Sequence, residues 1–371
     1  MSFELRKLED VCDILDHIRI PITSRDRKEG PYPYYGANGI QDYIDDYIFD
    51  DDLVLLAEDG GNFGSKEKPI AYRISGKTWV NNHAHVLKPK NIIDVDYLCY
   101  SLMYYDVSGL VNGATRQKLT QSEMRKINIR YRSLEKQRQI VFEIKLVSNI
   151  ISSRKHQLCN LDLLVKSRFV ELFLQANESF PKKKLGECTV INPKKSMDTR
   201  LKDDLIVSFV PMASVGEDGS IDTSEKKLYR EVKSGFTYFI EGDVLFAKIT
   251  PCMENGKGAV AINLYNGIGF GSTEFHVIRP LEGFTNPVWL YNLSVSKKFR
   301  LEAEANMTGS AGQKRTPASF LQNYEIKLPP IELQNQFADF AEQVDKSKLA
   351  IQQSLDELET LKKSLMQQYF G

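Results

Sequence analysis

The stretch from Ser133 to Phe173 limits the fold more than any other, because it contains neither glycine nor proline. Its apolar residues recur in alternating steps of three and four, with Arg154 and Arg168 at two of the steps. They are Ile140, Ile144, Val147, Ile151, Leu158, Leu161, Val165 and Leu172. This pattern is typical of a coiled-coil seam on one long helix. At about 1.5 Å per residue such a helix is roughly 60 Å long, so we expect it to pack along a partner helix.

The stretch from Ile331 to Phe370 provides that partner, since it repeats the first at an offset of 197 residues. The matching pairs include Gln137 and Gln334, and Leu158 and Leu355. Its seam is Phe337, Ala341, Val344, Lys348, Ile351, Leu355, Leu358, Lys362, Leu365 and Tyr369. Residues 134–173 hold seven Lys/Arg and four Asp/Glu, and residues 331–370 hold four and seven. One helix is therefore basic and the other acidic, which favours pairing within one chain over self-pairing of identical copies. The alternative is two unrelated coiled-coil segments, and a repeat that extends beyond the helices argues against it.

The parts of the chain before each long helix also repeat. Val54 to Ala57, the end of an expected buried strand, recurs as Val244 to Ala247, and His85-Val86 recurs as His276-Val277. The sequence thus predicts two copies of a β-rich domain followed by a long helix. We expect the two β-rich domains at residues 1–132 and 181–328, and the two long helices at residues 133–175 and 329–371. The fold class is α+β, with two β-rich domains joined by two long antiparallel coiled-coil helices in a pseudo-twofold internal repeat.

Composition excludes several classes of protein. The net charge is zero, so a nucleic-acid surface would have to be local. The five cysteines are scattered, which argues against a disulfide framework or a zinc site. The start of the chain lacks the apolar core of a signal peptide, and no apolar run is long enough for a membrane span. We therefore expect a cytoplasmic protein.

No catalytic constellation is apparent. Gly267 to Gly271 resembles a nucleotide-binding loop but lacks the following helix pattern, so we interpret it as a turn leading into a strand around Phe275. Carboxylate–lysine pairs at Glu143-Ile144-Lys145 and Glu325-Ile326-Lys327 match nuclease fragments only at the level expected by chance. His85 and His276 fit structural, hydrogen-bonded histidines. We expect no catalytic residue and no metal, and hence a protein that recognises rather than transforms its ligand.

Two kinds of surface segment suit DNA contacts. Small and basic residues just before each long helix favour phosphate binding, and polar or aromatic loops favour base contacts. The candidates are Tyr34, Tyr35, Asn38, Asn62, Lys66, Thr115, Arg116, Lys118, Lys195, Arg200, Lys248, Asn255, Lys257, Ser310, Lys314 and Arg315. The alternatives are solvated turns, core tyrosines and solvated lysine faces. The candidates for helix pairing or subunit docking are Ile140, Ile144, Val147, Leu158, Leu161, Phe337, Val344, Leu355 and Leu358.

The whole chain resembles the specificity subunits of type I restriction–modification systems. The resemblance rests on the two helix entries, Thr115 to Ile140 and Gly312 to Phe337. Pro329-Pro330 with Glu332 and Gln336 matches the family pattern, whereas the first copy has Arg132-Ser133 in place of the prolines. Gly271 to Val277 also resembles part of the family's second target-recognition domain.

This resemblance implies two target-recognition domains that each read one half of a bipartite double-stranded DNA sequence. The long helices would separate them and dock two methyltransferase subunits, and through these the restriction–translocase subunits. The chain would bind no cofactor, while S-adenosylmethionine, ATP and Mg would belong to the partner subunits. An adaptor for protein or carbohydrate ligands is the first alternative. A self-sufficient methyltransferase or nuclease is the second.

Overall fold

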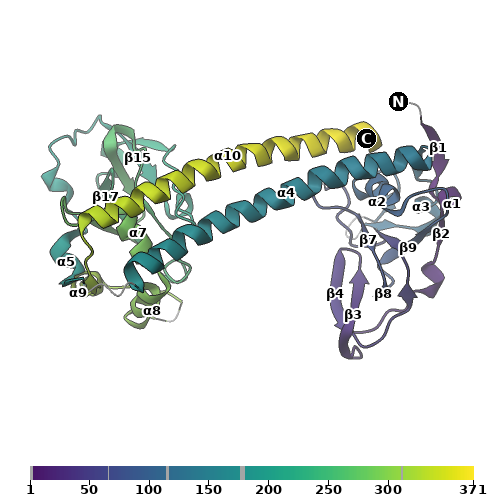
Figure 1. The fold of residues 1–371 in the computed structure, drawn as a ribbon, viewed down its shortest axis with the longest axis horizontal. Helices are drawn as coiled ribbons and strands as arrows, with labels where there is room; N and C mark the ends of the chain where they lie inside the picture. Colours follow the sequence, from purple (N-terminus) through teal and green to yellow (C-terminus); the bar gives the residue numbers. More distant parts are fainter. Residues whose placement is uncertain (1–2, 66, 114–116, 176–179, 311) are drawn as a thin grey trace. The chain divides into compact units, whose positions relative to one another are not determined.

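The computed structural model describes residues 3–65, 67–113, 117–175, 180–310 and 312–371 (Figure 1). The chain divides into two compact units. Unit 1 comprises Met1–His156 and Gln352–Gly371, and unit 2 comprises Gln157–Ile351. Each long helix therefore contributes one of its ends to each unit.

Unit 1 is built on two four-stranded sheets, ordered β2-β9-β6-β7 and β4-β3-β8-β5. All neighbours are antiparallel except β3 and β8. The strands are β1 (Glu4–Lys7), β2 (Cys12–Ile14), β3 (Glu29–Gly36), β4 (Gly39–Ile44), β5 (Phe49–Asp50), β6 (Leu53–Ala57), β7 (Ala71–Ile74), β8 (Lys77–Val80), β9 (Ala84–Pro89), β10 (Val111–Asn112), β11 (Lys118–Leu119) and β12 (Asn128–Tyr131). The helices are α1 (Leu8–Val11), η1 (Asp16–Ile18), α2 (Val95–Met103) and α3 (Gln121–Met124).

The expected strand at Leu53–Ala57 is confirmed as β6, and every residue in it is buried. Its alternate residues enter two different cores, Val54 and Leu56 in one and Leu53 and Leu55 in the other. Both faces of the strand are therefore covered, and its sequence does not alternate. A two-residue turn, Ala37-Asn38, joins β3 to β4. Gly39 directly after it adopts a positive φ of 111°, which glycine tolerates best.

Unit 2 repeats the strand orders of unit 1 as β14-β21-β18-β19 and β16-β15-β20-β17, again with one parallel pair, β15 and β20. The strands are β13 (Lys182–Lys184), β14 (Thr189–Ile191), β15 (Ile206–Val210), β16 (Lys226–Leu228), β17 (Thr237–Ile240), β18 (Val244–Ala247), β19 (Gly258–Val260), β20 (Ile268–Gly271), β21 (Phe275–Pro280) and β22 (Glu325–Lys327). The helices are α5 (Leu185–Cys188), η3 (Lys195–Met197), η4 (Met212–Ser214), α6 (Tyr229–Val232), η5 (Tyr265–Gly267), α7 (Pro287–Val295), α8 (Lys297–Ala305) and α9 (Ala318–Asn323). The internal repeat predicted from the sequence is therefore present in the topology.

The prediction for Gly267 to Gly271 needs correction. The turn ends at Gly267, and residues 268–271 form β20, an inner strand between β15 and β17. A Cβ atom at Gly269 would lie 2.1 Å from the Phe239 ring, and one at Gly271 would lie 2.2 Å from the Val210 carbonyl oxygen. These two glycines therefore permit close packing inside the sheet.

Both long helices are confirmed. α4 spans Leu134–Phe169 and continues into a π-helical turn, η2 (Val170–Leu174), while α10 spans Ile331–Phe370. In unit 1 the start of α4 packs with the end of α10, since Ile140 and Tyr369 share one core. In unit 2 the end of α4 meets the start of α10, where Phe169 and Phe337 share another. The helices are thus antiparallel within each unit.

The predicted seam residues are shielded from solvent to different degrees. Ile140, Ile144, Val147, Phe337, Val344 and Leu355 are buried, and Leu158, Leu161 and Leu358 are half-buried. Ion pairs link the two helices as their opposite charges suggest. Lys155 Nζ lies 2.8 Å from Glu359 in unit 1, and Lys348 Nζ lies 2.8 Å from Asp162 in unit 2.

The fourth residue of each long helix is a glutamine whose hydrogen bonds join the helix start to the globular part of the same unit. Gln137 is fully buried, accepts a hydrogen bond from Asp94 N at 2.8 Å, and donates to the carbonyls of Ile92 and Arg132 at 3.1 and 2.7 Å. The equivalent bonds of buried Gln334 reach Asn286 N, Phe284 O and Pro329 O at 2.9, 3.0 and 2.9 Å. We call each set of three bonds a glutamine anchor.

Arg132 accounts for the departure from Pro-Pro in the first copy. Its buried guanidinium donates to Tyr97 Oη and, at 3.2 Å, to the carbonyl oxygen of Tyr369 near the end of α10. A cation is favourable at this carbonyl-rich end of a helix. A proline at position 132 could not make these contacts.

Among the described residues, no helix is both long and apolar enough to cross a membrane.

Candidate nucleic-acid interface

Three segments that the sequence indicates as DNA contacts come together in unit 1. Asn38 Nδ2, in the β3–β4 turn, donates to Gly60 O at 2.9 Å. Gly60 N in turn donates to Gln117 O, and Asp59 forms a β-bridge with Lys118. The loop after β6 therefore lies between the hairpin turn and residues 117–120, which we call pre-helix segment 1.

Two tyrosines expected at this surface are buried or half-buried. Tyr34 is only 1% exposed, and its hydroxyl is hydrogen-bonded to the backbone of Ile22. The prediction of a DNA contact is wrong for Tyr34, because a side chain buried in this way cannot reach a ligand. Tyr35 is half-buried, with its ring 5.8 Å from that of Tyr72, and burial raises the pKa of its hydroxyl.

Of the remaining DNA-contact candidates in unit 1, Asn62 and Lys118 are among the described residues. Asn62 is half-buried in the loop after β6. Lys118 is half-exposed, with Nζ 3.0 Å from a Glu58 oxygen. Lys66, Thr115 and Arg116 lie outside the described residues.

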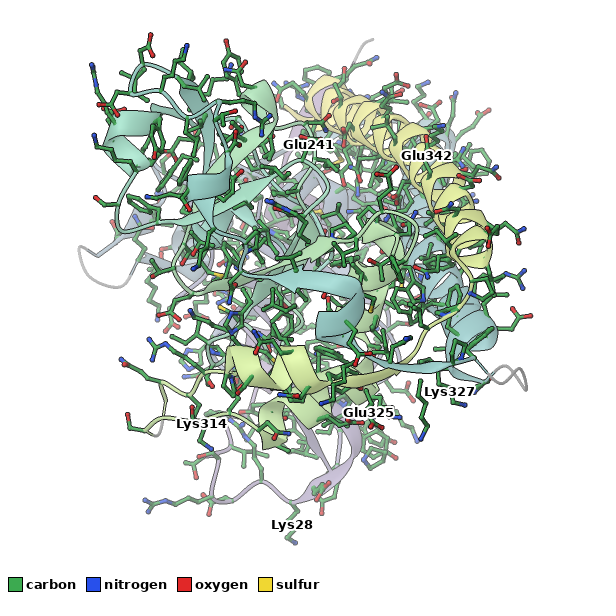
Figure 2. All side chains as sticks on the ribbon, turned by 90° about the vertical axis from the view of Figure 1, so that its left-hand side faces the viewer. Lys28, Glu241, Lys314, Glu325, Lys327 and Glu342 are labelled. Atoms are coloured by element: carbon green, nitrogen blue, oxygen red, sulfur yellow. The ribbon has the colours of Figure 1, made fainter. Side chains whose placement is uncertain are left out.

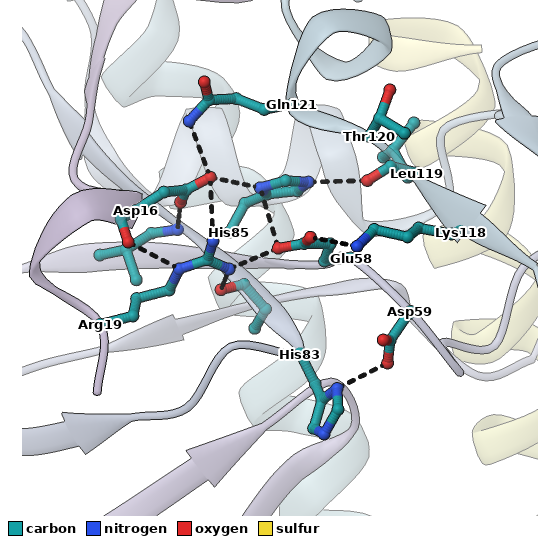
Figure 3. A network of polar contacts seen from close by, with 12 residues as sticks. Asp16, Arg19, Glu58, Asp59, His83, His85, Lys118, Leu119, Thr120 and Gln121 are labelled. Atoms are coloured by element: carbon teal, nitrogen blue, oxygen red, sulfur yellow. Dashed lines mark hydrogen bonds and ion pairs between the residues drawn. The ribbon is translucent and has the colours of Figure 1, made fainter. Parts of the chain in front are cut away.

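Behind Lys118 lies a network of charged groups (Figure 3). The Arg19 guanidinium lies 2.5 Å from Glu58 and 3.5 Å from Asp16. His85 Nδ1 lies 2.6 Å from Asp16, while its Nε2 lies 2.8 Å from the carbonyl oxygen of Leu119. The network thus connects η1, β6 and β9 with pre-helix segment 1.

The network keeps both acids ionised. Burial by itself would raise the pKa of Asp16, but hydrogen bonds from His85 and from Val86 N and the charge of Arg19 lower it overall. Burial also acts to raise the pKa of Glu58, and the hydrogen bonds from Arg19 and Lys118 outweigh it. Each carboxylate is therefore held by cations that belong to the chain.

Asp16, Glu58 and His85 also bring their ligand atoms within 4.8 Å of one another, which raises the question of a metal ion. The donor set does not fit one. Arg19 lies against both carboxylates and Lys118 against one of them, so a divalent cation would have to displace two cations already in place.

Acidification is expected to weaken unit 1 through these two carboxyls. Their pKa values are lowered by folding from ordinary values of 3.8 and 4.5, so the unfolded chain binds protons first as the pH falls. Their stabilising contribution should be complete well above pH 4.5 and be lost progressively as the pH falls through the lowered pKa values of the folded protein. Urea denaturation between pH 3 and 7 would measure the free energy of unfolding. In the double variant Asp16→Asn/Glu58→Gln, this free energy should fall less steeply at low pH than in the wild type. Asp46→Asn, at an exposed carboxyl, is the control, and an equal flattening there would contradict the assignment.

Unit 2 brings the equivalent segments together. Thr250 N donates to Lys314 O at 3.1 Å, and Thr316 N donates to Lys248 O at 2.9 Å. Ile249 forms a β-bridge with Arg315. The loop after β18 therefore lies against residues 313–316, which we call pre-helix segment 2.

Several predicted contacts of unit 2 already have partners within the chain. Arg315 donates to both oxygens of Glu274, and Arg200 donates to both oxygens of Asp198. Each guanidinium lowers the pKa of its partner carboxyl. The others that have partners are Lys195 on Lys233 O, Asn255 on Glu217 and Lys257 on Met212 O.

Other candidates are open to solvent. Ser310 and Lys314 are exposed, and Figure 2 shows Lys314 on a loop at the edge of unit 2. Figure 2 also labels Glu325 and Lys327, which are exposed on β22 on either side of buried Ile326. Lys248 is half-buried.

The two repeated histidines are structural, as expected. His276 Nε2 lies 2.8 Å from Thr316 O, matching His85 with Leu119 O. Asn192 in unit 2 takes the place of Asp16, accepting from Val277 N as Asp16 accepts from Val86 N. Burial, followed by the charge of Lys248, lowers the pKa of His276. Sequence reasoning found the histidines by their repetition but missed Asp16, Arg19, Glu58 and Glu274, which carry no local motif.

This chain is similar to known proteins of one family. The family model described as "Type I restriction modification DNA specificity domain" matches residues 2–160 and 177–360. The EcoAI specificity subunit of Escherichia coli is 44% identical over 146 residues, 39% of this chain but 24% of the relative. A putative type I specificity subunit of Haemophilus influenzae is 28% identical over 254 residues, covering 66% of this chain and 65% of the relative.

Solved structures share the architecture. The type I restriction–modification S subunit from M. genitalium superposes on the whole chain with a TM-score of 0.57 at 11% identity, and the match covers 96% of that protein. A structure described as showing complex assembly and conformational transition of the type I R-M system gives 0.58 at 17% identity, covering 97% of that chain. At these identities the likeness concerns the fold.

Two β-rich units, each closed by a long helix, define a duplicated recognition protein. The chain belongs to the family of type I restriction–modification DNA specificity domains. Proteins of this class are non-catalytic recognition components. The chain matches only about a quarter of the length of the EcoAI relative.

Proposed function

We propose that this chain is the specificity subunit of a type I restriction–modification enzyme and reads a bipartite double-stranded DNA sequence. The observation that carries the proposal is the family match over both repeats. In both units, moreover, the loop after an inner strand meets the pre-helix segment, at Lys118 in one and Lys314 in the other. Each unit would read one half-site.

Side chains that reach solvent at these places are the proposed DNA contacts. They are Asn38 and Lys118 in unit 1, and Asn255, Ser310 and Lys314 in unit 2. Arg200 is exposed on another loop, where its guanidinium is paired with Asp198. Amides suit base edges, and lysines suit phosphates. Because the net charge is zero, we expect weak, strongly salt-dependent DNA binding by the isolated chain and tighter binding with partners.

Methylation mapping tests this function. The chain would be co-expressed in the cytoplasm of a host with its methyltransferase subunits, which would supply S-adenosylmethionine binding and adenine methylation. One bipartite methylated motif is the expected outcome. Absence of any new methylated motif, together with binding to a protein or carbohydrate instead of DNA, would support the adaptor alternative. ATP and Mg would be needed only by the restriction–translocase subunits.

An apolar stripe on α4 is the proposed docking surface for a methyltransferase subunit. Phe142, Leu146 and Ile150 follow at intervals of four residues, and they are 67%, 49% and 37% exposed. Three large apolar side chains on one helical face are costly to leave in water and are typical of an interface core. The predicted coiled-coil pairing of the seam leaves this face uncovered within unit 1.

A charge placed in this stripe is expected to prevent docking. Phe142→Glu should weaken co-purification of the methyltransferase subunit at least about tenfold, because an unpaired carboxylate would be buried in the interface. Ser152→Glu, which adds the same charge at an exposed position outside the stripe, is the control. Unchanged co-purification of the Phe142 variant, with a normal melting temperature, would place the docking surface elsewhere.

A further inference from the structure

Unit 2 contains a hollow of about 290 Å³ near β21 and the loop after β18. Its lining combines cationic, hydroxyl and aromatic side chains, and among the described residues it includes no carboxylate. The lining includes Lys195, Thr237, Lys248, Thr273 and His276. The two strands beside the hollow are the counterparts of β6 and β9 in unit 1.

Lys248 in this hollow occupies the position that Glu58 has in unit 1. In unit 1, Glu58 N donates to His83 O at 2.9 Å and Glu58 O accepts from Leu119 N at 2.7 Å. In unit 2, Lys248 N donates to Glu274 O and Lys248 O accepts from Thr316 N, both at 2.9 Å. The backbone is thus the same, and a carboxylate has been exchanged for an ammonium group.

This exchange reverses the local charge. In unit 1 the Glu58 carboxylate lies among Arg19, Lys118 and His85, at 2.5, 3.0 and 3.7 Å. The other acid of that network, Asp16, is replaced in unit 2 by neutral Asn192. Unit 1 therefore contains its own anion at this place, while unit 2 contains a cation and open space.

The hydrogen bond from Arg315 and the charge of Lys248 lower the pKa of the Glu274 carboxyl, but no ion pair between Lys248 and Glu274 is found among the residues that the structure describes. No hydrogen bond or ion pair to Lys248 Nζ is found there, although the side chain is half-buried. The neighbouring acids are engaged, Glu274 by Arg315 and Asp198 by Arg200 and Tyr238. A partly desolvated, unpaired ammonium group is unfavourable, and a bound anion would relieve that cost.

We propose that this hollow binds a phosphate group, with Lys248 as the cationic ligand, and that the DNA backbone supplies the phosphate. Lysine is a common point-charge partner of phosphate, and Thr237 and Thr273 offer hydroxyl donors beside it. The backbone link from Lys248 to pre-helix segment 2 puts the hollow next to the proposed DNA contacts. The DNA source rests on the proposed function, and binding of phosphate itself does not.

The test uses the full chain with its methyltransferase subunits and three variants. Lys248→Gln should weaken binding to cognate DNA about 8-fold at 0.1 M salt and lower the salt slope by about one, as expected for one lost phosphate contact. Sequence preference should not change. Lys248→Glu copies unit 1 and should bind DNA still more weakly while remaining folded. Lys298→Gln, an exposed lysine on α8, should behave like wild type.

A second arm separates the two phosphate sources. Inorganic phosphate should raise the melting temperature of the wild-type chain above that in chloride of equal ionic strength, and should not do so for Lys248→Glu. DNA in which one phosphate at a time is replaced by a neutral methylphosphonate locates the contact. At one position the replacement should weaken DNA binding by the wild type and leave DNA binding by Lys248→Gln unchanged. Stabilisation by phosphate without this DNA effect would indicate a free-phosphate site. An unchanged salt slope and no phosphate effect would overturn the inference, whereas wild-type complex that binds no DNA would overturn the proposed function.

Discussion

Replacing Phe337 with alanine is expected to destabilise unit 2 by roughly 3–5 kcal/mol, the range for emptying a well-packed aromatic site. Phe337 is 1% exposed, and its ring centroid lies 5.4 and 5.5 Å from those of Phe169 and Phe173 in edge-to-face contacts. It is a fully buried residue of α10 in the core of unit 2, where Leu333 and Phe340 of the same helix also pack. Few neighbours can fill the gap, because both facing rings are held on one helix.

The two tryptophans of the chain make the measurement specific to each unit. Trp79 lies in unit 1 and Trp289 in unit 2, where it packs 6.2 Å from Phe173. Urea denaturation of Phe337→Ala in a Trp79→Phe background would follow Trp289 alone. Leu349→Ala, at a 62% exposed position of the same helix, should change little. If Phe337→Ala and Leu349→Ala gave similar shifts, the packing argument would fail.

Removing either glutamine anchor should cost about 3 kcal/mol, because each change leaves a backbone N–H and two carbonyls without a buried partner. Gln334→Ala should act on the Trp289 signal and Gln137→Ala on the Trp79 signal. Gln334→Glu is the sharper variant, since it keeps the size of the side chain but cannot donate to Phe284 O or Pro329 O when ionised.

Matched controls for the anchors lie two residues further along each helix. Gln139 and Gln336 are exposed, and alanine there should change the free energy of unfolding by less than about 0.5 kcal/mol. A glutamine anchor variant that unfolds like its control would mean that the three bonds add nothing to stability. Equal loss in both tryptophan signals from one variant would mean that the anchor does not act within its own unit.

The helices and the repeat could be predicted because their signals are local or periodic. The seam from Ile140 to Leu172 predicts a long helix, and the apolar run Leu53–Ala57 predicts a buried strand, each from residues close together in the chain. Gln137 and Gln334 were visible as a repeated pair, yet their burial and bonds were not. Those bonds join the helix to Ile92 and Phe284, and no sequence pattern connects residues so far apart.

The candidate interface was predicted less well for a related reason. Tyr34 was expected at the surface because it lies in a turn-rich aromatic stretch, but its strand lies inside a sheet and its hydroxyl is bonded to the backbone. Arg200 and Arg315 were recognised as cations, while their partners Asp198 and Glu274 were not. Whether a charge is free for a ligand depends on tertiary neighbours, and a single sequence does not contain them.

The glutamine anchors also have a consequence for how the two halves of this chain diverged. If the halves arose by duplication, each pair of equivalent residues shows which side chains the same backbone position accepts. The glutamine anchors and the two histidines make the same hydrogen bonds in both halves. In contrast, unit 2 has Lys248 where unit 1 has Glu58, and Pro329 where unit 1 has Arg132. The unchanged pairs mark what the shared frame requires. The altered pairs mark where one half became free to acquire a task that the other does not have.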